Sequence, residues 1–220
     1  MLRTTIIFLT IYFSCSLGVT QNYKIGLLKY NGGGDWYSNP TALTNLIVFF
    51  NENTGSNIHS NYDEIDIASP ELFNYPWVHL TGHGNVVFSE EEVINLKNYL
   101  IAGGFLHISD NYGLDPFIRK EIKKLFPNLD FVELPHNHPI YNEIYDFPNG
   151  LPKIHEHDNK TPLGLGIIYE GRLVCFYDHE CDLSDGWEDQ DVHNDSEETR
   201  LKALKMGVNI LSYSFLGKYD

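Results

Sequence analysis

The 220-residue chain carries 30 acidic and 15 basic residues, and 42% of it is apolar. This length and apolar content suit one globular domain with a substantial core. The formal charge of −15 disfavours a nucleic-acid partner, because an acidic surface repels the phosphate backbone. The charge suits an exported protein, a cation-binding protein or a protein that faces neutral sugars.

A short apolar run at residues 4–13 follows the charge of Arg3 and precedes small and polar residues. This layout is typical of a secretory signal peptide, and the run is too short to span a bilayer comfortably. We therefore expect a signal peptide at 1–20, a single domain at 21–220, and a mature protein in the periplasm or cell envelope without a membrane span. An uncut membrane anchor, or a lipoprotein with lipid on Cys15, is the alternative.

The first half of the chain is predicted to alternate strands and helices. The expected order is a strand at 23–30, a glycine-rich loop at 31–36, a helix capped by Asn39, a weak strand or connector at 65–67, a strand at 77–80, a helix with a capping box at Ser89 and Glu92, a strand at 104–109 and a helix from Asp115. Such alternation predicts a doubly wound α/β fold, with a mostly parallel sheet covered by helices on both faces.

The second half departs from this alternation. The expected order is a strand at 131–134, an irregular segment at 135–162, a hairpin at 163–177 that turns at Glu170-Gly171, an acidic loop at 178–195 and a last helix capped by Asp195. A long irregular segment is unusual in a compact domain unless it is functional, so we expect the two loops to fold over the strand ends as a lid. Cys175 and Cys181 are either disulfide-bonded or free, and neither alternative is favoured.

Two predicted strands end in polar elbows flanked by glycine. The first elbow carries His83 and the second carries Asp110. Ligands bind at the carboxyl ends of the strands in open α/β sheets, and neighbouring strands are about 4.8 Å apart, so the two side chains should lie within roughly 10 Å. We predict His83 and Asp110 as the catalytic pair, with Asp110 as a base or ligand that shares a proton with His83.

Histidine and carboxylate residues concentrate in the loops. Seven of the ten histidines are His83, His136, His138, His155, His157, His179 and His193, all in elbows or loops. In the run His155-Glu156-His157-Asp158, two imidazoles point to one side of an extended chain. His155, His157 and Asp158 are therefore predicted ligands of zinc or another divalent metal, the candidate cofactor, and a solvated acidic loop is the alternative. The 178–195 loop could also hold calcium through its carboxylates, although it lacks the spacing of a calcium loop.

Aromatic and polar residues in the same loops are typical of sugar sites, although they also anchor loops to a core. The predicted ligand-binding residues are Gly33, Gly34, Asp35, Trp36, Tyr112, His138, Trp187 and Glu188. If the loops bury charged groups, His155, His157, Asp158 and Glu188 should have partners, because unpaired buried charges are costly.

Several long motifs resemble domain-of-unknown-function family 4159. They are Leu28–Tyr37, the Thr81-Gly82-His83-Gly84 elbow, Gly103-Gly104-Phe105, His138–Tyr141, Phe147–His155, Gly186–Asp189 and His193–Asp195. The resemblance covers nearly all of the predicted mature chain. It implies a flavodoxin-like three-layer sandwich, similar to class I glutamine amidotransferases and their trehalose-utilisation (ThuA-like) branch. Amidotransferases need a cysteine at the elbow where this chain has Asp110-Asn111, which argues against glutaminase activity.

Two hypotheses follow for the function. The first is an enzyme or degenerate enzyme that acts on a small polar molecule or carbohydrate through a His/Asp site at the strand ends. The second is a non-catalytic binding or assembly module whose partners are cell-envelope proteins. Fold analogy cannot decide between them. A closed cluster of His83, Asp110, His155 and Glu188 would favour the enzyme, and scattered side chains would favour the module.

Overall fold

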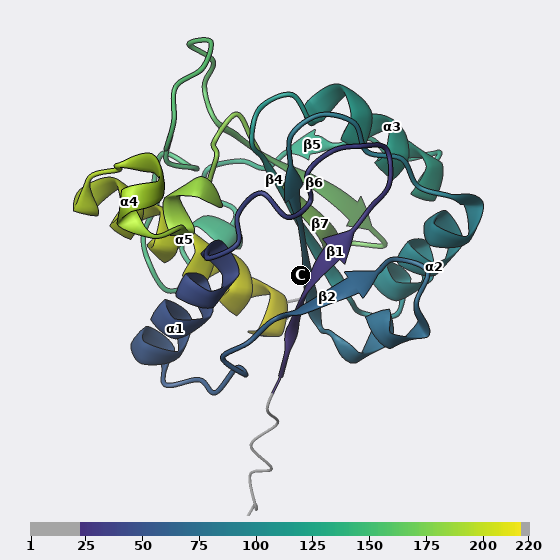
Figure 1. Ribbon diagram of the computed structural model, residues 1–220, viewed down its shortest axis with the longest axis horizontal. Coiled ribbons are helices and arrows are strands. Elements are labelled where there is room, and N and C mark those ends of the chain that lie inside the picture. The colour runs from purple at the N-terminus through teal and green to yellow at the C-terminus, as the bar shows by residue number, and fades with distance from the viewer. Residues whose placement is uncertain (1–22, 217–220) are drawn as a thin grey trace, which may run out of the picture.

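The computed structural model describes residues 23–216, so the predicted signal peptide lies outside the described residues. The elements follow in the order β1 (Ile25–Lys29), α1 (Ala42–Thr54), β2 (Asp63–Asp66), η1 (Pro70–Asn74), β3 (Trp77–Gly82), α2 (Glu90–Ile101), β4 (Phe105–Asp110), α3 (Asp115–Leu125), β5 (Val132–Glu133), η2 (Pro139–Tyr141), β6 (Leu163–Tyr169), β7 (Arg172–His179), η3 (Asp185–Trp187), α4 (Gln190–His193) and α5 (Glu197–Leu216) (Figure 1). Within the described part of the chain, no helix is long and apolar enough to cross a membrane.

The strands form one sheet in the order β2-β1-β3-β4-β7-β6-β5. The first five strands in this order are parallel, whereas β6 runs antiparallel to β7 and to β5. This is the predicted flavodoxin-like arrangement with a hairpin added at one edge. The carboxyl ends of β1, β3, β4 and β7 therefore share one edge of the sheet.

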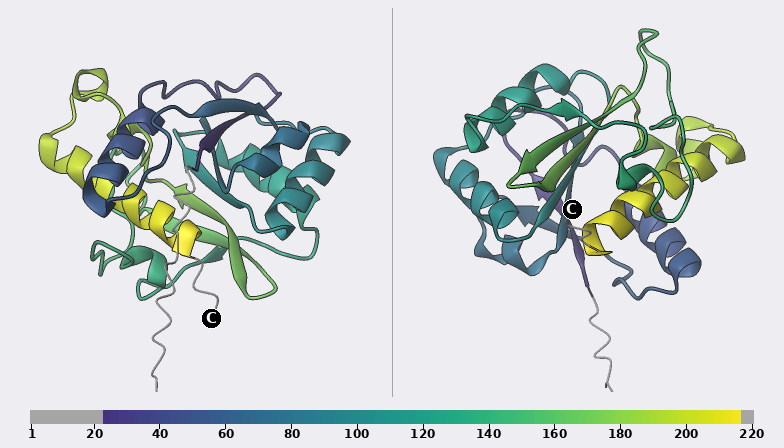
Figure 2. Two further views of the ribbon diagram at one scale, coloured as in Figure 1. Left: turned by 90° about the horizontal axis from the view of Figure 1, so that it is seen from below. Right: turned by 180° about the vertical axis from the view of Figure 1, so that it is seen from behind.

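Helices cover both faces of the sheet and complete three layers (Figure 2). On one face α1 and α5 pack through side chains such as Leu46 and Val208. On the other face α2 and α3 pack through side chains such as Leu96 and Ile122. The two helix layers thus bury two separate apolar clusters against the sheet, which is the main source of stability in this kind of fold.

Two of the three predicted helix caps are wrong. The capping box of Ser89 and Glu92 is present at the start of α2. However, α1 begins at Ala42 without a side-chain cap, and the Asn39 side chain lies in a buried network instead. At α5, the Ser196 hydroxyl accepts the hydrogen bond from the backbone N–H of Thr199, so Ser196 and not Asp195 caps the helix.

The second half of the chain follows the prediction in outline. The hairpin of β6 and β7 turns at Glu170 and Gly171, as predicted. Between β5 and β6 the only regular element described is the short η2. The 178–195 segment is more ordered than a loop, because β7 extends to His179 and is followed by η3 and α4. Cys175 and Cys181 are both buried and free, so the alternative of two thiols is correct.

The core contains a polar group that the sequence pattern did not reveal. His79 and His107 are buried on neighbouring strands, with their Nδ1 atoms 3.0 Å apart. The Nε2 of His107 lies 2.9 Å from Oδ2 of Asp178, which is also fully buried. Both imidazoles lie against the ring of Trp187. Burial lowers the pKa of His79 to about 3.

Candidate functional site

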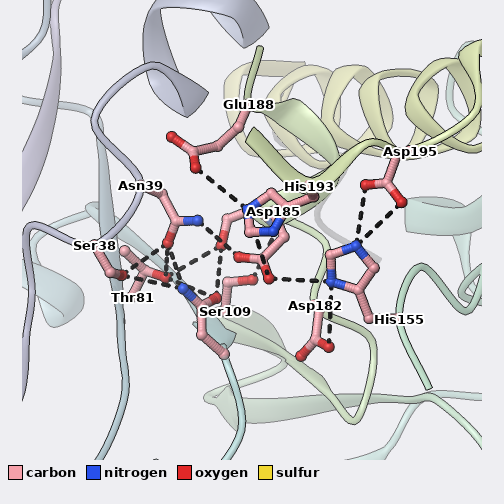
Figure 3. Close-up of polar contacts among 12 residues, drawn as sticks. Ser38, Asn39, Thr81, Ser109, His155, Asp182, Asp185, Glu188, His193 and Asp195 are labelled. Atoms are coloured by element: carbon pink, nitrogen blue, oxygen red, sulfur yellow. Dashed lines mark hydrogen bonds and ion pairs between the residues drawn. The ribbon is translucent and has the colours of Figure 1, made fainter. Parts of the chain in front are cut away.

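The candidate site is a polar network at the carboxyl edge of the sheet (Figure 3). The register pairs Gly82 of β3 with Asp110 of β4, so the two predicted elbows do lie side by side. The segments that follow β1, β3, β4 and β7 contribute the polar side chains. The site therefore lies where the fold predicts a ligand site.

Asn39 links the inner part of this network to its outer part. Its Nδ2 donates a 2.7 Å hydrogen bond to Oδ1 of Asp185. Its Oδ1 accepts hydrogen bonds from the Thr81 hydroxyl at 3.2 Å and from the Asn111 amide. Ser184 contacts both Thr81 and Asn111 through its hydroxyl. All five side chains are buried, so each polar group is held in one orientation.

His155 lies between two carboxylates in the outer part of the site. Its Nδ1 is 3.2 Å from Oδ2 of Asp185, and its Nε2 is 3.0 Å from Asp195. The hydrogen bond to Asp185 raises the pKa of His155 to about 9, against the effect of burial and with a further contribution from Asp195. Burial by itself raises the pKa of Asp185, but the hydrogen bonds from His155 and Asn39 outweigh it and lower the pKa.

His193 completes a group with the composition of a metal site. Its Nε2 lies 4.0 Å from Oδ2 of Asp185, and ligand atoms of His155, Asp185 and His193 all lie within 4.8 Å of one another. Two imidazoles and a carboxylate are the ligand types that zinc and other transition metals prefer. Atoms at this separation can surround a single ion after a small adjustment.

Glu188 is buried beside this group and is held by α1. Its Oε1 accepts hydrogen bonds from the backbone N–H and the hydroxyl of Thr41, at 3.2 and 3.1 Å. Its Oε2 faces Nε2 of His193 at 3.3 Å. The second oxygen of this carboxylate therefore faces the histidine cluster.

The turn after β7 supplies two more carboxylates. Oδ2 of Asp182 lies 2.5 Å from Nε2 of His157 and 3.8 Å from Nδ1 of His155. Burial raises the pKa of Asp182 to about 6, and the charge of Asp185 adds to the rise. Glu180 accepts a 3.0 Å hydrogen bond from Lys160. These contacts join the 153–160 and 178–195 segments.

The structure places the predicted catalytic pair at the ends of neighbouring strands and gives its two members different partners. His83 is exposed and its Nδ1 lies 3.1 Å from Oδ2 of Asp35. Asp110 is buried, accepting hydrogen bonds from the Tyr177 hydroxyl at 2.9 Å and from the backbone N–H of Leu114 at 3.1 Å. Asp110 therefore holds the start of α3 against β7, and Asp35 is the carboxylate that contacts His83.

Of the predicted metal ligands, only His155 belongs to the metal-type group. His157 pairs with Asp182, and the carboxylate of Asp158 lies 2.5 Å from the ammonium of Lys160. The hydrogen bond from Lys160 lowers the pKa of Asp158. Both residues belong to the contact between the loops.

The predicted ligand-binding residues fall in three places. Asp35 and Glu188 belong to the polar edge, and Tyr112 is half-exposed with its ring 4.6 Å from that of His157. Gly33 and Gly34 lie in the loop before Asp35. Trp187 is a core residue, fully buried with its Nε1 bonded to the carbonyl oxygen of Ala203.

Two more of the predicted ligand-binding residues, Trp36 and His138, contact the core or a short helix. Trp36 is partly buried against both apolar clusters. His138 begins η2, where its Nδ1 accepts the backbone N–H of Ile140.

Sequence reasoning did not single out Asn39, Asp185, His193 or Asp195 as site residues. Asn39 and Asp195 were assigned to helix caps, because each precedes a predicted helix. Asp185 and His193 stood among many acidic and histidine residues of one loop, and nothing in their spacing separates them from their neighbours. The motifs Gly186–Asp189 and His193–Asp195 are the signal that could have marked them.

The comparison with protein families gives one result. A family model described as a domain of unknown function (DUF4159) matches residues 24–215. No curated protein matches the chain. The match spans every strand and helix that positions the candidate site.

Proposed function

Since the chain belongs to the domain of unknown function family DUF4159, we propose its function from its own site. We infer that it binds one divalent transition-metal ion through His155, Asp185 and His193. We infer further that the ion activates water for the hydrolysis of a small polar or carbohydrate substrate. The convergence of these three side chains within 4.8 Å carries the proposal.

The donor set suits a catalytic metal. Two imidazoles and one carboxylate favour zinc or a similar ion over calcium and magnesium, which prefer oxygen ligands. Three protein ligands also leave a coordination position open for water, as in catalytic zinc sites. A water bound to such an ion ionises near neutral pH and becomes a nucleophile.

Contacts around the three ligands support the proposal. Nε2 of His155 faces Asp195 at 3.0 Å, and a bound ion would replace the contact between Nδ1 and Oδ2 of Asp185. Oδ1 of Asp185 accepts from Asn39 at 2.7 Å, which leaves Oδ2 for the same ion. Metal ligands in proteins commonly have such outer partners, which fix their orientation. Oε2 of Glu188 lies beside the three ligands, 3.3 Å from Nε2 of His193, where it could also accept a hydrogen bond from a water on the ion.

The charge of the edge favours an uncharged substrate. Asp35, Asp182 and Glu188 add to the carboxylates of the metal-type group, so a negatively charged substrate would be repelled. Hydroxyl-rich neutral molecules match the hydrogen-bonding groups without this cost. For the same reason, we retain carbohydrates as the leading substrate class.

Metal binding can be measured without knowing the substrate. Protein stripped of metal with a chelator is titrated with Zn²⁺ in a calorimeter, and we expect one ion per chain. The variants His155→Ala and His193→Ala should lose this binding. The variant Asp195→Asn, which removes an outer partner, should weaken it by about 10- to 100-fold.

His59 provides a matched control, because it lies before β2 at the opposite edge of the sheet. The variant His59→Ala should bind Zn²⁺ as the unchanged protein does. If the unchanged protein binds no Zn²⁺, or if His155→Ala and His59→Ala bind it equally, the proposal is wrong. Hydrolysis of neutral sugar esters and glycosides, with and without Zn²⁺, then tests the catalytic part.

An apolar groove favours the second candidate, a binding module of the cell envelope. The groove measures about 450 Å³ and lies between the ends of α1 and α5, lined by Tyr23, Phe50, Ile58, Ile144 and Phe215. The groove lies at the edge of the sheet opposite the polar site, so a partner bound in the groove would not use the polar site. On this alternative, Ile144→Asp should stop the chain from sedimenting with envelope membranes, whereas His155→Ala should not.

A further inference from the structure

The carboxyl ends of β1 and β3 are the expected ligand position of this fold. In the strand order β2-β1-β3-β4, the chain leaves β1 for one neighbour and later returns to the other. Ligands of doubly wound folds bind at such a switch point, at the carboxyl ends of the two strands. Here the loops that flank it carry Asp35, after β1, and His83, after β3.

Asp35 and His83 form an oriented pair between the loops that follow these two strands. Oδ2 of Asp35 lies 3.1 Å from Nδ1 of His83, and Oδ1 accepts the backbone N–H of the same histidine. A carboxylate in this position keeps the proton on Nδ1 and leaves the lone pair on Nε2. The His83 side chain is 53% exposed, so that lone pair is accessible to a ligand.

The two loops are built to hold this pair in place. The backbone N–H of Gly34 donates to the carbonyl of Asn85 at 3.0 Å, and the N–H of Val87 donates to the carbonyl of Asn31 at 2.8 Å. A Cβ on Gly34 would lie 2.7 Å from the carbonyl oxygen of His83, so only glycine permits this approach. A surface ion pair that forms by chance needs no such packing.

The loops that follow β1, β3 and β4 indicate the kind of ligand. Tyr37 is 63% exposed and Tyr112 is 50% exposed, and Tyr112 has a φ of 74°, which is rare for a non-glycine residue. Strained residues of this kind cluster at functional sites. The segments 31–38, 83–88 and 111–114 contain no lysine or arginine, so an anionic ligand would find no counter-charge.

We propose that Asp35 and His83 form a general-base pair that hydrolyses uncharged esters at the carboxyl ends of β1 and β3, independently of the metal centre. Nε2 of His83 takes a proton from water while the water oxygen bonds to the ester carbonyl carbon. The carbon–oxygen bond to the alcohol then breaks, and the alcohol leaves with the proton from the imidazolium. Ester and water thus give acid and alcohol. His83 is the catalytic residue and Asp35 is a positioning residue.

The test uses p-nitrophenyl acetate, an uncharged ester, with a chelator present throughout so that the metal centre contributes nothing. We expect His83→Gln to lower the protein-dependent rate at least about tenfold, the low end for the loss of a general base. Asp35→Asn should lower it nearly as far. His59→Gln, which removes a histidine at the opposite edge, should leave the rate unchanged.

Imidazole nitrogen NMR provides the second measurement, because it reads the role of Asp35 directly. We expect the proton on Nδ1 of His83 in the unchanged protein, and on Nε2 in Asp35→Asn. A loss of rate in His59→Gln equal to that in His83→Gln would overturn the proposal. So would a proton on Nε2 in the unchanged protein. If the protein does not bind zinc, the hydrolysis rates and the NMR measurement still test this proposal.

Discussion

His79 is a buried base whose one hydrogen-bond partner among residues 23–216 is another histidine. Its Nδ1 contacts His107, whereas its Nε2 has no hydrogen-bond partner among the described residues. A protonated ring would therefore bring a charge into the core without a direct carboxylate partner. For this reason burial lowers the pKa of His79 to about 3.

Acid should destabilise the protein through this residue. In the unfolded chain a histidine has a pKa of about 6.5, so below that pH the unfolded state binds a proton that the folded state does not. The stability that neutral His79 contributes is complete above pH ~6.5 and falls by up to about 1.4 kcal/mol per pH unit toward pH ~3. Urea unfolding between neutral pH and about pH 5 measures this slope.

The comparison of variants isolates the contribution of His79. In His79→Phe, the change of the unfolding free energy with pH should be smaller by the contribution of about one proton. The stability of the variant itself does not affect this comparison, because the slope reports the number of protons taken up on unfolding. An equal slope in the unchanged protein and in His79→Phe would show that His79 does not titrate in this way.

Single residues also explain where sequence analysis of the site failed. Asn39 has the side chain and the position of a helix cap, yet its amide bonds to Asp185, 146 residues further along the chain. Asp195 likewise bonds to His155, and Ser196 beside it caps α5. A cap is a local preference worth about 1 kcal/mol. A buried carboxylate without a partner costs more, so the distant contact determines the conformation.

At the scale of elements, the turn after β7 joins the two polar segments of the second half. Glu180 and Asp182 both have a φ of 57°, in the left-handed region that non-glycine residues seldom adopt. Each carboxylate reaches the 153–160 segment, through Lys160 and His157. The strain in the turn is therefore offset by ion pairs that hold the two segments together.

Elements with a repeating apolar pattern were predictable, and the segments between them were not. The core strands, α2, α3 and the β6–β7 hairpin follow directly from apolar spacing and turn residues. The 135–162 and 178–195 segments lack such a period, and long-range polar contacts determine their course. The candidate site lies mainly in these segments, so its location was more predictable than its composition.

The capping box at the start of α2 allows a quantitative test. The Ser89 hydroxyl accepts the backbone N–H of Glu92, and the Glu92 carboxylate accepts the backbone N–H of Ser89. Ser89→Ala should lower the free energy of unfolding by about 1 kcal/mol, measured by urea denaturation. Ser56→Ala, at an exposed serine after α1, should change it little. Equal effects of both variants would mean that the box does not stabilise α2.

At the scale of the whole molecule, the predicted signal peptide lies outside the described residues. We predict that the mature chain begins between Leu17 and Asn22, because the apolar run behind Arg3 has the layout of a cleaved leader. N-terminal sequencing of the protein from the native envelope fraction measures this. A retained Met1 would contradict the prediction.

The segment between β1 and α1 carries three contacts of the polar edge within seven residues. Asp35 orients His83, Asn39 holds Asp185, and Thr41 holds Glu188. The spacing along this one segment therefore sets the alignment of the proposed base with the proposed metal centre. Adding or removing a single residue there would displace all three contacts at once. The turn at Glu170 and Gly171, which joins β6 to β7, carries none of these contacts and can vary in length. A library of loop lengths should therefore be restricted to that turn.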